Sequence, residues 1–519
     1  MNFSKRTKYL FLGLLVSLNF VIRIPSVPHE IGNDSFGIHI LANSISLLGY
    51  AKWWVNSLSV FGMYPYSYAS SVPFILSGIS QCTGVDMELV IWIYCVIIGI
   101  FSAFTAYLLA GAIWNDDVFK FLVAFAYSIS SGILTFSTWD ATTRGLFMIL
   151  LPLFIYLLLK IRASVIKYAI LALIAFTLLI ATHHFFLLLI PIVFSLIIVT
   201  TFDKLKRYIK FKISEDLISI SLIIGFIGVL LIPFFTGLFI EWGRYDELHW
   251  MIRNNVRYTG ALIIFTISGI IYLIFKHNKK FEEWFLLLVT LSLVIFLYLE
   301  TYIHYFIIIF ACLFIGIALT NVSRVEKQKR KYAALSIVIF LSLSIVFSGF
   351  YQHWRTHQGG VYGDWYLDEE GYAGAVWTKE NVDMNKKLVG NDNLLCKRMS
   401  AISGVPTLLK DVSCCMFVYG FADINTTPIV KRSPLSISYY KDNPYAIHRL
   451  HILPGWYRNT LQGRDVDSQA AKGIIRSFDL AYFIENQNIG RNKFISSLYT
   501  KKDNVYDNGN IRVWAIEEN

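Results

Sequence analysis

Residues 89–114 read LVIWIYCVIIGIFSAFTAYLLAGAIW and contain no Asp, Glu, Lys or Arg. A helix rises 1.5 Å per residue, so a run of this length crosses the hydrocarbon core of a membrane, which is about 30 Å thick. The rest of the chain has a similar character, because 55% of its 519 residues are hydrophobic and its mean hydropathy is +0.54. These values are too high for a soluble protein of this size, so the sequence indicates an integral membrane protein.

Comparable apolar segments lie on both sides of this run. They predict an all-α membrane domain of about eleven transmembrane helices, in which three spans stand alone and eight form four helical hairpins. The single spans are Tyr9–Pro25, Leu89–Trp114 and Tyr332–Tyr351, and the hairpins are Val118–Lys160, Val165–Thr201, Leu217–Phe275 and Phe285–Thr320.

The polar links between these spans alternate in charge, and the alternation predicts the topology. The links that we place in the cytoplasm hold 20 Lys and Arg against 8 Asp and Glu, a net charge of +12, and the whole chain carries +11. Because Lys and Arg favour the cytoplasmic side, insertion orientation accounts for the basic charge and no nucleic-acid partner is indicated. We therefore predict a cytoplasmic N-terminus and an external C-terminus.

The composition becomes that of a soluble protein near Gln352. We predict a membrane domain over residues 1–351 and an extracytoplasmic α/β domain over residues 352–519. The pattern is helical at Glu369–Glu380 and strand-like at Lys387–Val389 and Ala481–Ile484, and Asp507-Asn508-Gly509 is a hairpin signal.

The six cysteines form no metal-ligand spacing and no clear disulfide framework. Only Cys396, Cys414 and Cys415 lie in the predicted external domain. A disulfide from Cys396 to either of the other two is left open.

The first external loop carries an acidic residue, Asp34, in the run His29-Glu30-Ile31-Gly32-Asn33-Asp34-Ser35-Phe36. A carboxylate at the membrane surface can act as a general base or bind a divalent metal. The alternative is structural, because Asp is a good N-cap and residues 34–50 have the pattern of an amphipathic surface helix.

The tip of the first hairpin carries Asp140 and Arg144, which are four residues apart. One interpretation is an ion pair on one helix face, which lowers the cost of burying the two charges. The other is a second carboxylate that faces Asp34, together with an Arg that binds a phosphate.

Two later tips carry histidines. His183 and His184 are adjacent, so on a helix they diverge by ~100° and share a ligand only if the turn is irregular. Glu300 and His304 form an i,i+4 pair, and ionisable residues at membrane depth are functional candidates.

All of these groups lie on the same side as the first external loop, and the span interiors hold almost no ionisable residues. A transporter would place such groups near the midplane of the membrane. The distribution therefore favours an enzyme that works at the outer surface on a membrane-anchored reactant.

This combination resembles the C-type (GT-C) membrane glycosyltransferases. Within them, Gly32-Asn33-Asp34-Ser35-Phe36 looks like the first-loop acidic motif of oligosaccharyltransferase catalytic subunits. Asp140 falls where their second acidic motif lies, and Glu300 matches a later glutamate loosely. The segment from Tyr64 to Gly84 and the C-terminal run from Val505 also resemble prokaryotic membrane proteins of this superfamily.

The chain departs from oligosaccharyltransferases in two respects. It lacks their Trp-Trp-Asp-Tyr-Gly motif, since Trp53-Trp54 is followed by Val55, and it has eleven predicted spans rather than the usual thirteen. Transfer of a single sugar or a short glycan to a glycan, lipid or protein acceptor therefore fits better than protein N-glycosylation.

The resemblance implies an enzyme that takes a sugar from a polyprenyl-phosphate donor in the plasma membrane of a prokaryote. Asp34 and Asp140 would be catalytic, and a divalent cation (Mg²⁺ or Mn²⁺) on these carboxylates is left open. Arg144, His183, His184, Glu300 and His304 would bind the substrate. The alternatives are a transporter or flippase of lipid-linked saccharides and a non-catalytic membrane assembly protein.

Overall fold

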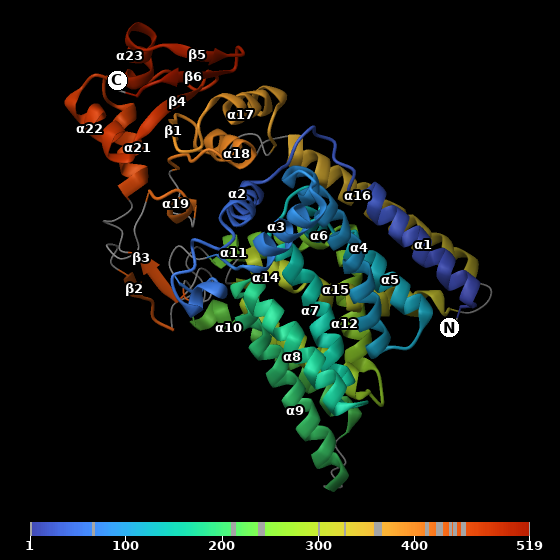
Figure 1. Cartoon of the computed structure of the whole chain (residues 1–519). Coiled ribbons are helices and arrows are strands. Elements are labelled where there is room, and N and C mark those ends of the chain that lie inside the picture. The colour runs from blue at the N-terminus through green and yellow to red at the C-terminus, as the bar shows by residue number, and fades with distance from the viewer. Residues whose placement is uncertain are drawn as a thin grey trace.

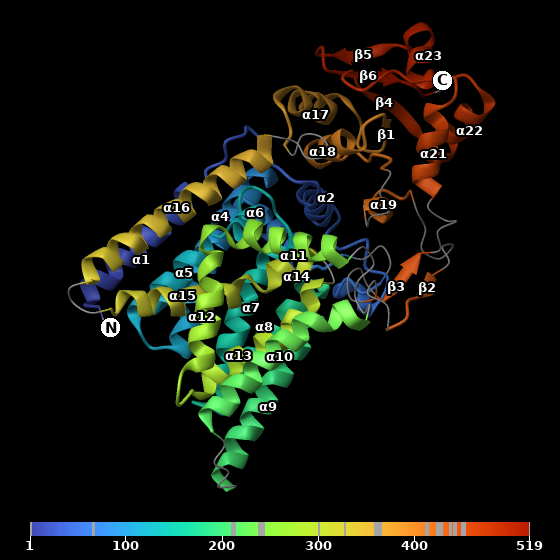
Figure 2. The same ribbon diagram turned by 180° about the vertical axis from the view of Figure 1, so that it is seen from behind.

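The structure is a computed structural model. It describes residues 3–517 apart from 65–67, 209–213, 237–243, 299–300, 326–328, 358–365, 410–414, 422–428, 435–438, 440–443 and 448–452. A long helical bundle carries a smaller mixed domain at one end, and helix α2 lies between the two (Figures 1 and 2).

Each of the eleven predicted spans contains a helix. These helices are α1 (Lys5–Val21), α4 (Met87–Ile113), α5 (Asp117–Ser128), α7 (Thr143–Lys160), α8 (Val165–Thr182), α9 (Leu189–Tyr208), α10 (Glu215–Thr236), α12 (Ile264–Phe275), α13 (Phe281–Val294), α15 (Ile308–Ser323) and α16 (Arg330–His357). Shorter helices lie between them: α2 (Asn33–Leu48), α3 (Ser71–Thr83), α6 (Ser131–Thr135), α11 (Arg244–Thr259), α14 (Thr301–Phe306), and the 3₁₀ turns η1 (Ser57–Val60), η2 (His184–Leu188), η3 (Ala261–Ile263) and η4 (Ile295–Tyr298).

The helices differ in their ability to cross a membrane. Among the described residues, six are long and apolar enough to do so, and the pair His249–Thr259 and Ala261–Phe275, which is bent by 115°, makes a seventh candidate. The chain is therefore a multi-pass membrane protein. The count of eleven spans stays a prediction, because α1, α5 and α13 are shorter than a full crossing.

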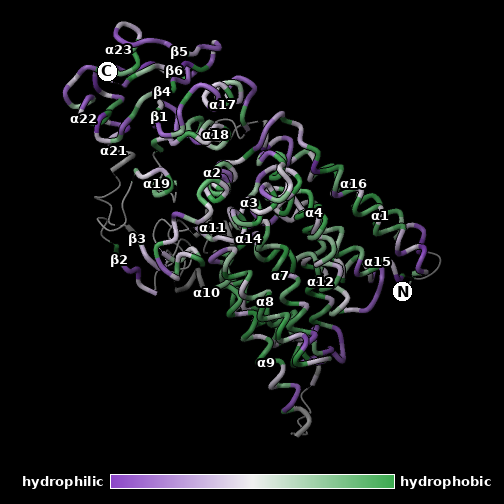
Figure 3. Tube along the Cα trace, in the orientation of Figure 1, coloured by the Kyte–Doolittle hydropathy of each residue, from purple (hydrophilic) through white to green (hydrophobic). Residues whose placement is uncertain are grey.

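The centre of the bundle is α15, whose apolar window is 89% buried. It packs closely on α12, because a Cβ at Gly269 would lie 2.1 Å from the carbonyl oxygen of Phe314. Small residues let two helix backbones approach this closely. In lipid such close packing matters, because the hydrophobic effect does not drive helices together there. In contrast, α8 and α16 expose large apolar side chains such as Ile166, Leu173 and Val346, which indicates a surface that faces lipid. Figure 3 shows that the bundle helices, α8 among them, are mostly hydrophobic along their length.

The predicted topology can be tested by cysteine labelling in intact cells. Single cysteines placed near Lys206 and Arg330 should be shielded from an impermeant thiol reagent, because both positions lie in basic links that favour the cytoplasm. Cysteines near Arg253 and in residues 366–409 should be labelled. Labelling near Lys206 without permeabilisation would overturn the predicted orientation.

The C-terminal domain, which we predict to be external and call the external domain, is built on a four-stranded mixed sheet with the order β1-β4-β6-β5. Strands β1 and β4 are parallel, and β4, β6 and β5 pair in antiparallel fashion. The predicted helix at Glu369–Glu380, both strands and the hairpin at Asp507-Asn508-Gly509 are confirmed. The elements are α17 (Glu369–Asn381), β1 (Lys387–Gly390), α18 (Asn393–Ser403), α19 (Cys415–Val418), β2 (Ile429–Lys431), β3 (Tyr445–Ile447), α21 (Leu453–Gln462), α22 (Gln469–Phe478), β4 (Leu480–Asn486), α23 (Lys493–Lys501), β5 (Asn504–Asp507) and β6 (Ile511–Ala515).

The structure describes two of the three cysteines of this domain. Cys396 and Cys415 are buried, and Cys414 lies outside the described residues.

Helix α2 joins the external domain to the bundle. Its Phe36, Ile40 and Leu41 belong to the same buried apolar cluster as Leu388 and Phe483 of the external sheet. Two polar contacts add to this packing: Asn43 donates to the Ala401 carbonyl at 2.9 Å and Lys52 donates to the Val418 carbonyl at 3.0 Å. The prediction of a helix resting on the membrane surface is therefore wrong for Phe36, Ile40 and Leu41, which the external domain covers, whereas Leu47 and Leu48 stay exposed at the end of the helix.

Candidate functional site

Asp34 lies in the first turn of α2 but does not cap it. The N-cap is Gly32, which has φ = 88° and makes no side-chain capping bond. The N-cap interpretation of Asp34 is therefore wrong, because the chain enters the helix two residues earlier. The Asp34 carboxylate instead accepts a hydrogen bond from Arg144 at 2.7 Å and is 38% exposed. Its side chain is thus held in place and still accessible.

Asp140 lies in the connection between α6 and α7, beside the first external loop. Two hydrogen bonds join the connection to the loop: the Ile31 N–H donates to the Trp139 carbonyl at 3.1 Å, and the Ala141 N–H donates to Ser35 Oγ at 2.8 Å. Trp139 has φ = 53°, a left-handed conformation that is costly for a large residue and is found where neighbours fix the backbone. The two acidic motifs therefore meet, although they are about a hundred residues apart.

Gly32 allows the close approach of the two motifs. A Cβ at this position would lie 2.3 Å from Asp140 Oδ1, so any side chain would displace the carboxylate. The Asp140 carboxylate therefore rests against the backbone at the start of α2. The positive end of the helix dipole lies there, which favours a negative charge.

Two ion pairs hold the two carboxylates. Arg144, from α7, binds Asp34, while Arg355, from the outer end of α16, donates to Asp140 at 3.0 Å and to the Thr135 carbonyl at 2.9 Å. The interpretation of Asp140 and Arg144 as one i,i+4 pair is wrong, because Asp140 precedes α7 and is not helical. The observed pairs instead tie the first loop, the first hairpin and the last bundle helix together.

Burial shifts the protonation equilibrium of Asp140 toward the neutral form. Its side chain is 3% exposed, and Oδ1 has no hydrogen-bond partner in the described part of the chain. Burial is the main reason that the pKa of Asp140 is raised to about 6. Arg355 opposes this rise, Asp34 adds to it and Arg144 opposes it, so the two carboxylates influence each other. Perturbed carboxylates in such paired settings are typical of functional sites.

His183 and His184 lie at an irregular break between α8 and α9. His183 is extended, with φ = −161°, and its Nδ1 accepts the N–H of Phe185 at 3.1 Å. The two ring centroids are 4.1 Å apart. The break is therefore the irregular turn that the two histidines need in order to share a ligand. Burial, His184 and Arg144 lower the pKa of His183, which places this histidine near the arginine of the carboxylate cluster.

The tip of the fourth hairpin lies only partly within the described residues. Glu300 lies outside the described residues. His304 is buried on α14 and meets the Trp250 ring of α11 edge-on at 5.2 Å. Neither of its ring nitrogens has a hydrogen bond among the described residues. Helix α11 runs through the tip of the third hairpin, and its Arg257 bonds Tyr351 at 2.5 Å.

Two basic residues of this region were missed in the sequence. Arg355 binds Asp140, and Lys397 of α18, which is 7% exposed, donates to Asn33 Oδ1 at 3.0 Å. A cation at the outer end of a span runs against the positive-inside preference, so Arg355 could have been singled out. Lys397 has no such sequence signal, because the partner comes from a distant part of the chain.

The carboxylates provide a partial ligand set for a metal. No group of three or more His, Cys, Asp or Glu side chains suited to a metal is found within the described ranges. Asp34 and the unpartnered Oδ1 of Asp140 still fit Mg²⁺ or Mn²⁺, because Mg²⁺ often takes one or two carboxylates and completes its shell with water and substrate phosphate.

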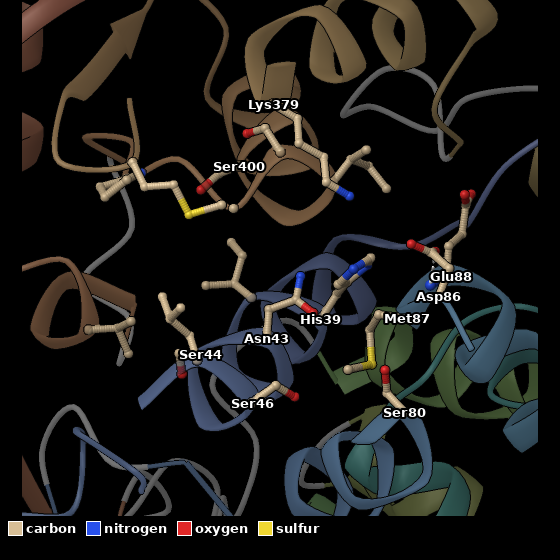
Figure 4. Close-up of a pocket in the computed structure, with 18 of the residues that line it drawn as sticks. His39, Asn43, Ser44, Ser46, Ser80, Asp86, Met87, Glu88, Lys379 and Ser400 are labelled. Carbon is tan, nitrogen blue, oxygen red and sulfur yellow. Dashed lines mark hydrogen bonds between the residues drawn. The ribbon is translucent and has the colours of Figure 1, made fainter. Parts of the chain in front are cut away.

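A separate cavity of about 1060 Å³ lies between α2, the α3–α4 turn and helices α17 to α19 (Figure 4). His39, Asn43 and Ser46 of α2 line one wall, and Lys379 and Ser400 of the external domain face them. Asp34 and Asp140 are not part of its lining. The cavity and the carboxylate cluster are therefore lined by different residues.

His29 connects the first loop to the external domain. Its Nδ1 lies 3.1 Å from Glu88 and its Nε2 lies 3.5 Å from Glu369 of α17. Its ring stacks on Tyr372 with centroids 3.8 Å apart. Burial lowers the pKa of His29, but Glu88 and Glu369 outweigh this effect, so the pKa is raised.

This contact should make the docking of the external domain depend on pH. A raised pKa in the folded state means that the stabilisation is fully present below the ordinary pKa of about 6.5 and is lost as pH rises through the folded-state value. The His29→Phe variant keeps the stacked ring and removes the charge. We expect it to melt at a lower temperature than the wild type at pH 6 and at a similar temperature at pH 9. An equal difference at both pH values would exclude the charged contact.

No protein-family model and no curated protein sequence matches the chain. Solved structures are similar to it. An apo oligosaccharyltransferase from Archaeoglobus fulgidus superimposes with a TM-score of 0.61 and 11% identity, over 99% of this chain and 75% of that one. The same archaeal enzyme, AglB, in complex with an inhibitory peptide and a dolichol-phosphate gives a TM-score of 0.58 at 12% identity, over 93% and 69%.

Two other transferases match over nearly the whole chain. ArnT from Cupriavidus metallidurans bound to undecaprenyl phosphate has a TM-score of 0.56 and 10% identity, over 99% of each chain. The mycobacterial arabinofuranosyltransferase AftD, as a mutant, has a TM-score of 0.57 and 13% identity, over 100% of this chain and 42% of that one. The chain therefore has the GT-C fold that the first-loop and second acidic motifs suggested.

Proposed function

We propose that this protein is a membrane glycosyltransferase that moves a sugar from a polyprenyl-phosphate donor to an acceptor at the external face. The observation that carries this proposal is the meeting of Asp34 and Asp140 in a GT-C fold, with each carboxylate held by an arginine. The dolichol-phosphate and undecaprenyl phosphate bound to AglB and ArnT support a lipid-linked donor. We place the protein in the plasma membrane of a prokaryote, with the external domain outside.

The proposed reaction is a single displacement at the anomeric carbon. The acceptor hydroxyl oxygen forms a bond to this carbon while the bond from the carbon to the phosphate oxygen breaks. The polyprenyl phosphate leaves with the bonding electron pair, and the hydroxyl proton passes to a carboxylate. Asp34 is the better placed of the two carboxylates for this role, because it is accessible and Asp140 is buried.

The basic groups around the carboxylates suit the charge that develops on the leaving phosphate. Arg144 binds Asp34, and its guanidinium lies 5.2 Å from the Phe136 ring centroid. Arg355 binds Asp140, and the charge of Arg144 also acts on His183. Fixed donors that point at developing charge supply much of the rate in transfer reactions. Asp140 would keep Arg355 in place for this purpose.

A divalent cation bound by Asp34 and Asp140 would neutralise part of the phosphate charge. The acceptor is a glycan, a lipid headgroup or a protein side chain that carries a nucleophile. Its chemical class is taken up in the next subsection.

The test is turnover by the purified full-length protein with a panel of radiolabelled polyprenyl-phosphate sugars. We expect free polyprenyl phosphate and a labelled acceptor product to form together with at least one donor. If no donor is consumed but donor lipids cross the bilayer of proteoliposomes, the transporter alternative is correct. If neither process occurs, the protein is a non-catalytic assembly component and the proposal fails.

A further inference from the structure

A buried carboxylate and imidazole pair lies beside the cavity between α2 and the external domain. The Glu30 side chain is fully buried, and its Oε2 lies 2.7 Å from Nδ1 of His39. A carboxylate on one ring nitrogen fixes the tautomer and ring orientation of a histidine, so Nδ1 donates and Nε2 is left as the acceptor. His39 is therefore a rigid acceptor in the cavity wall, where Figure 4 places it next to Asn43.

Asn43 is also oriented by the fold. It lies one turn after His39 on α2, and its amide nitrogen donates to the Ala401 carbonyl at 2.9 Å. Its amide oxygen has no hydrogen bond in the parts of the chain that the structure describes. Two neighbouring acceptors on one helix face therefore line the same space, held from behind by the first loop and by the external domain.

The opposite wall supplies donors and an aromatic surface. Lys379 of α17 points across the space toward α2 (Figure 4). Tyr372 and Tyr419 also line the cavity, and Tyr419 shares a hydrogen bond with Ser400 at 2.6 Å. Such a wall suits a ligand that offers both O–H donors and oxygen acceptors, and that has flat C–H faces to place on aromatic rings.

The charge of the lining argues against two other ligand classes. The two lysines, Lys52 and Lys379, are balanced by Asp86, Glu88 and Glu380, so the cavity does not attract a phosphate. Apolar side chains such as Leu47, Met87 and Met384 line part of the cavity, but an acyl chain would desolvate the Asn43 amide oxygen and the charged groups of the lining without replacing their hydrogen bonds to water. A neutral polyhydroxylated ligand satisfies both conditions. The volume, about 1060 Å³, lies at the upper end of ligand-site volumes and admits more than one sugar ring.

We propose that this cavity binds a neutral saccharide that forms part of the acceptor, and that Nε2 of His39 accepts a hydrogen bond from one of its hydroxyls. The assignment to the acceptor rests on the proposed transferase function. His39 lies five residues after Asp34 on α2 and is bound to Glu30 of the first loop, so a saccharide held here would lie beside the loop that carries Asp34. Glu30 acts through His39 and is a positioning residue.

The experiment measures saccharide binding by the full-length protein in nanodiscs without donor. Saturation-transfer NMR with a panel of neutral methyl glycosides and disaccharides identifies the ligands that bind. We expect saturable binding of at least one glycoside by the wild type, and binding at least 10-fold weaker in His39→Gln and in Asn43→Ala. His277→Gln makes the same chemical change in an exposed link far from the cavity and should bind normally. Thermal melting of each variant controls for folding, and Asn43→Ala covers the case in which His39→Gln does not fold.

The outcomes separate this inference from the proposed function. Asp34→Asn should bind the glycoside like the wild type while losing transfer. Binding that depends on His39 without transfer from any donor would support the cavity and defeat the transferase. Transfer with an unchanged acceptor KM in both His39→Gln and Asn43→Ala would support the transferase and overturn the cavity assignment. Binding of none of the glycosides, or displacement of a bound glycoside by an acceptor peptide, would also overturn it.

Discussion

Asp34→Asn should reduce sugar transfer by ~10²-fold or more while the protein inserts and folds normally. The amide keeps the shape of the side chain, and its oxygen can still accept the hydrogen bond from Arg144, which is 2.7 Å long in the wild type. It cannot take a proton from an acceptor hydroxyl. The loss should therefore lie in kcat rather than in folding yield. The measurement is the initial rate with a radiolabelled polyprenyl-phosphate sugar, normalised to folded protein.

Two further variants separate chemistry from structure at this position. Asp34→Glu keeps the carboxylate but moves it by one methylene, so it should retain more activity than Asp34→Asn. Asn33→Asp adds a carboxylate one position earlier and should not rescue Asp34→Asn, because geometry decides which carboxylate meets the acceptor. A rate for Asp34→Asn equal to that of the wild type would leave the residue with a structural role in binding Arg144.

Arg355→Met should have the second-largest effect and should act through Asp140. The guanidinium is the main group that opposes the rise in the pKa of Asp140, which lies at about 6. An opposite charge in contact lowers a carboxyl pKa by roughly 1 to 3. Without Arg355 the carboxyl should stay protonated above neutral pH. We expect activity at pH 7 to fall by on the order of 10-fold or more, with the acid limb of the pH–rate profile displaced to higher pH.

The control for this prediction is Arg355→Lys, which keeps the positive charge. The acid limb of its pH–rate profile should be displaced much less than that of Arg355→Met. The double variant Asp140→Asn with Arg355→Met removes both members of the buried pair. Near neutral pH it should be about as stable as Arg355→Met, whose Asp140 is protonated, and at higher pH it should be the more stable of the two, because there the Asp140 of Arg355→Met becomes an unpaired buried charge. It should not regain activity. A pH–rate profile for Arg355→Met that matches the wild type would show that Asp140 does not need its charge.

Much of the fold could be predicted from the sequence, because membrane insertion depends on local composition. The run from Leu89 to Trp114 forms α4, which spans Met87–Ile113. The external hairpin was equally local, since Asp507-Asn508-Gly509 carries its own turn signal and forms the β5–β6 connection. These elements need few distant partners, so their sequences alone indicate them.

The lengths of the helices and the position of α2 were harder to predict. Hydropathy does not reveal that α5 ends at Ser128 and is followed by the short helix α6, because tertiary packing decides where an apolar helix breaks. The pattern of α2 fits a membrane surface and a domain interface equally well. Only the apolar face of the external domain, more than three hundred residues away, decides between them.

The carboxylates of the site were found, but their partners were not. Asp34 and Asp140 could be singled out because each lies in a predicted external link where GT-C enzymes have an acidic motif. The i,i+4 spacing of Asp140 and Arg144 suggested the wrong pair, since spacing has meaning only on a continuous helix and α7 begins at Thr143. Arg355 and Lys397 reach the site from other parts of the chain, and no local pattern assigns long-range partners.

The most direct test of the central claim is the release of free polyprenyl phosphate by purified wild type, Asp34→Asn and Asp140→Asn, followed by mass spectrometry at equal folded protein. The two carboxylates are proposed to form one site, so both variants should release the lipid phosphate at least ~10²-fold more slowly than the wild type. His277→Gln, in an exposed link far from the carboxylates, should match the wild type. Release at the wild-type rate by both Asp variants would contradict the account, because sugar transfer would then not take place at this pair of carboxylates.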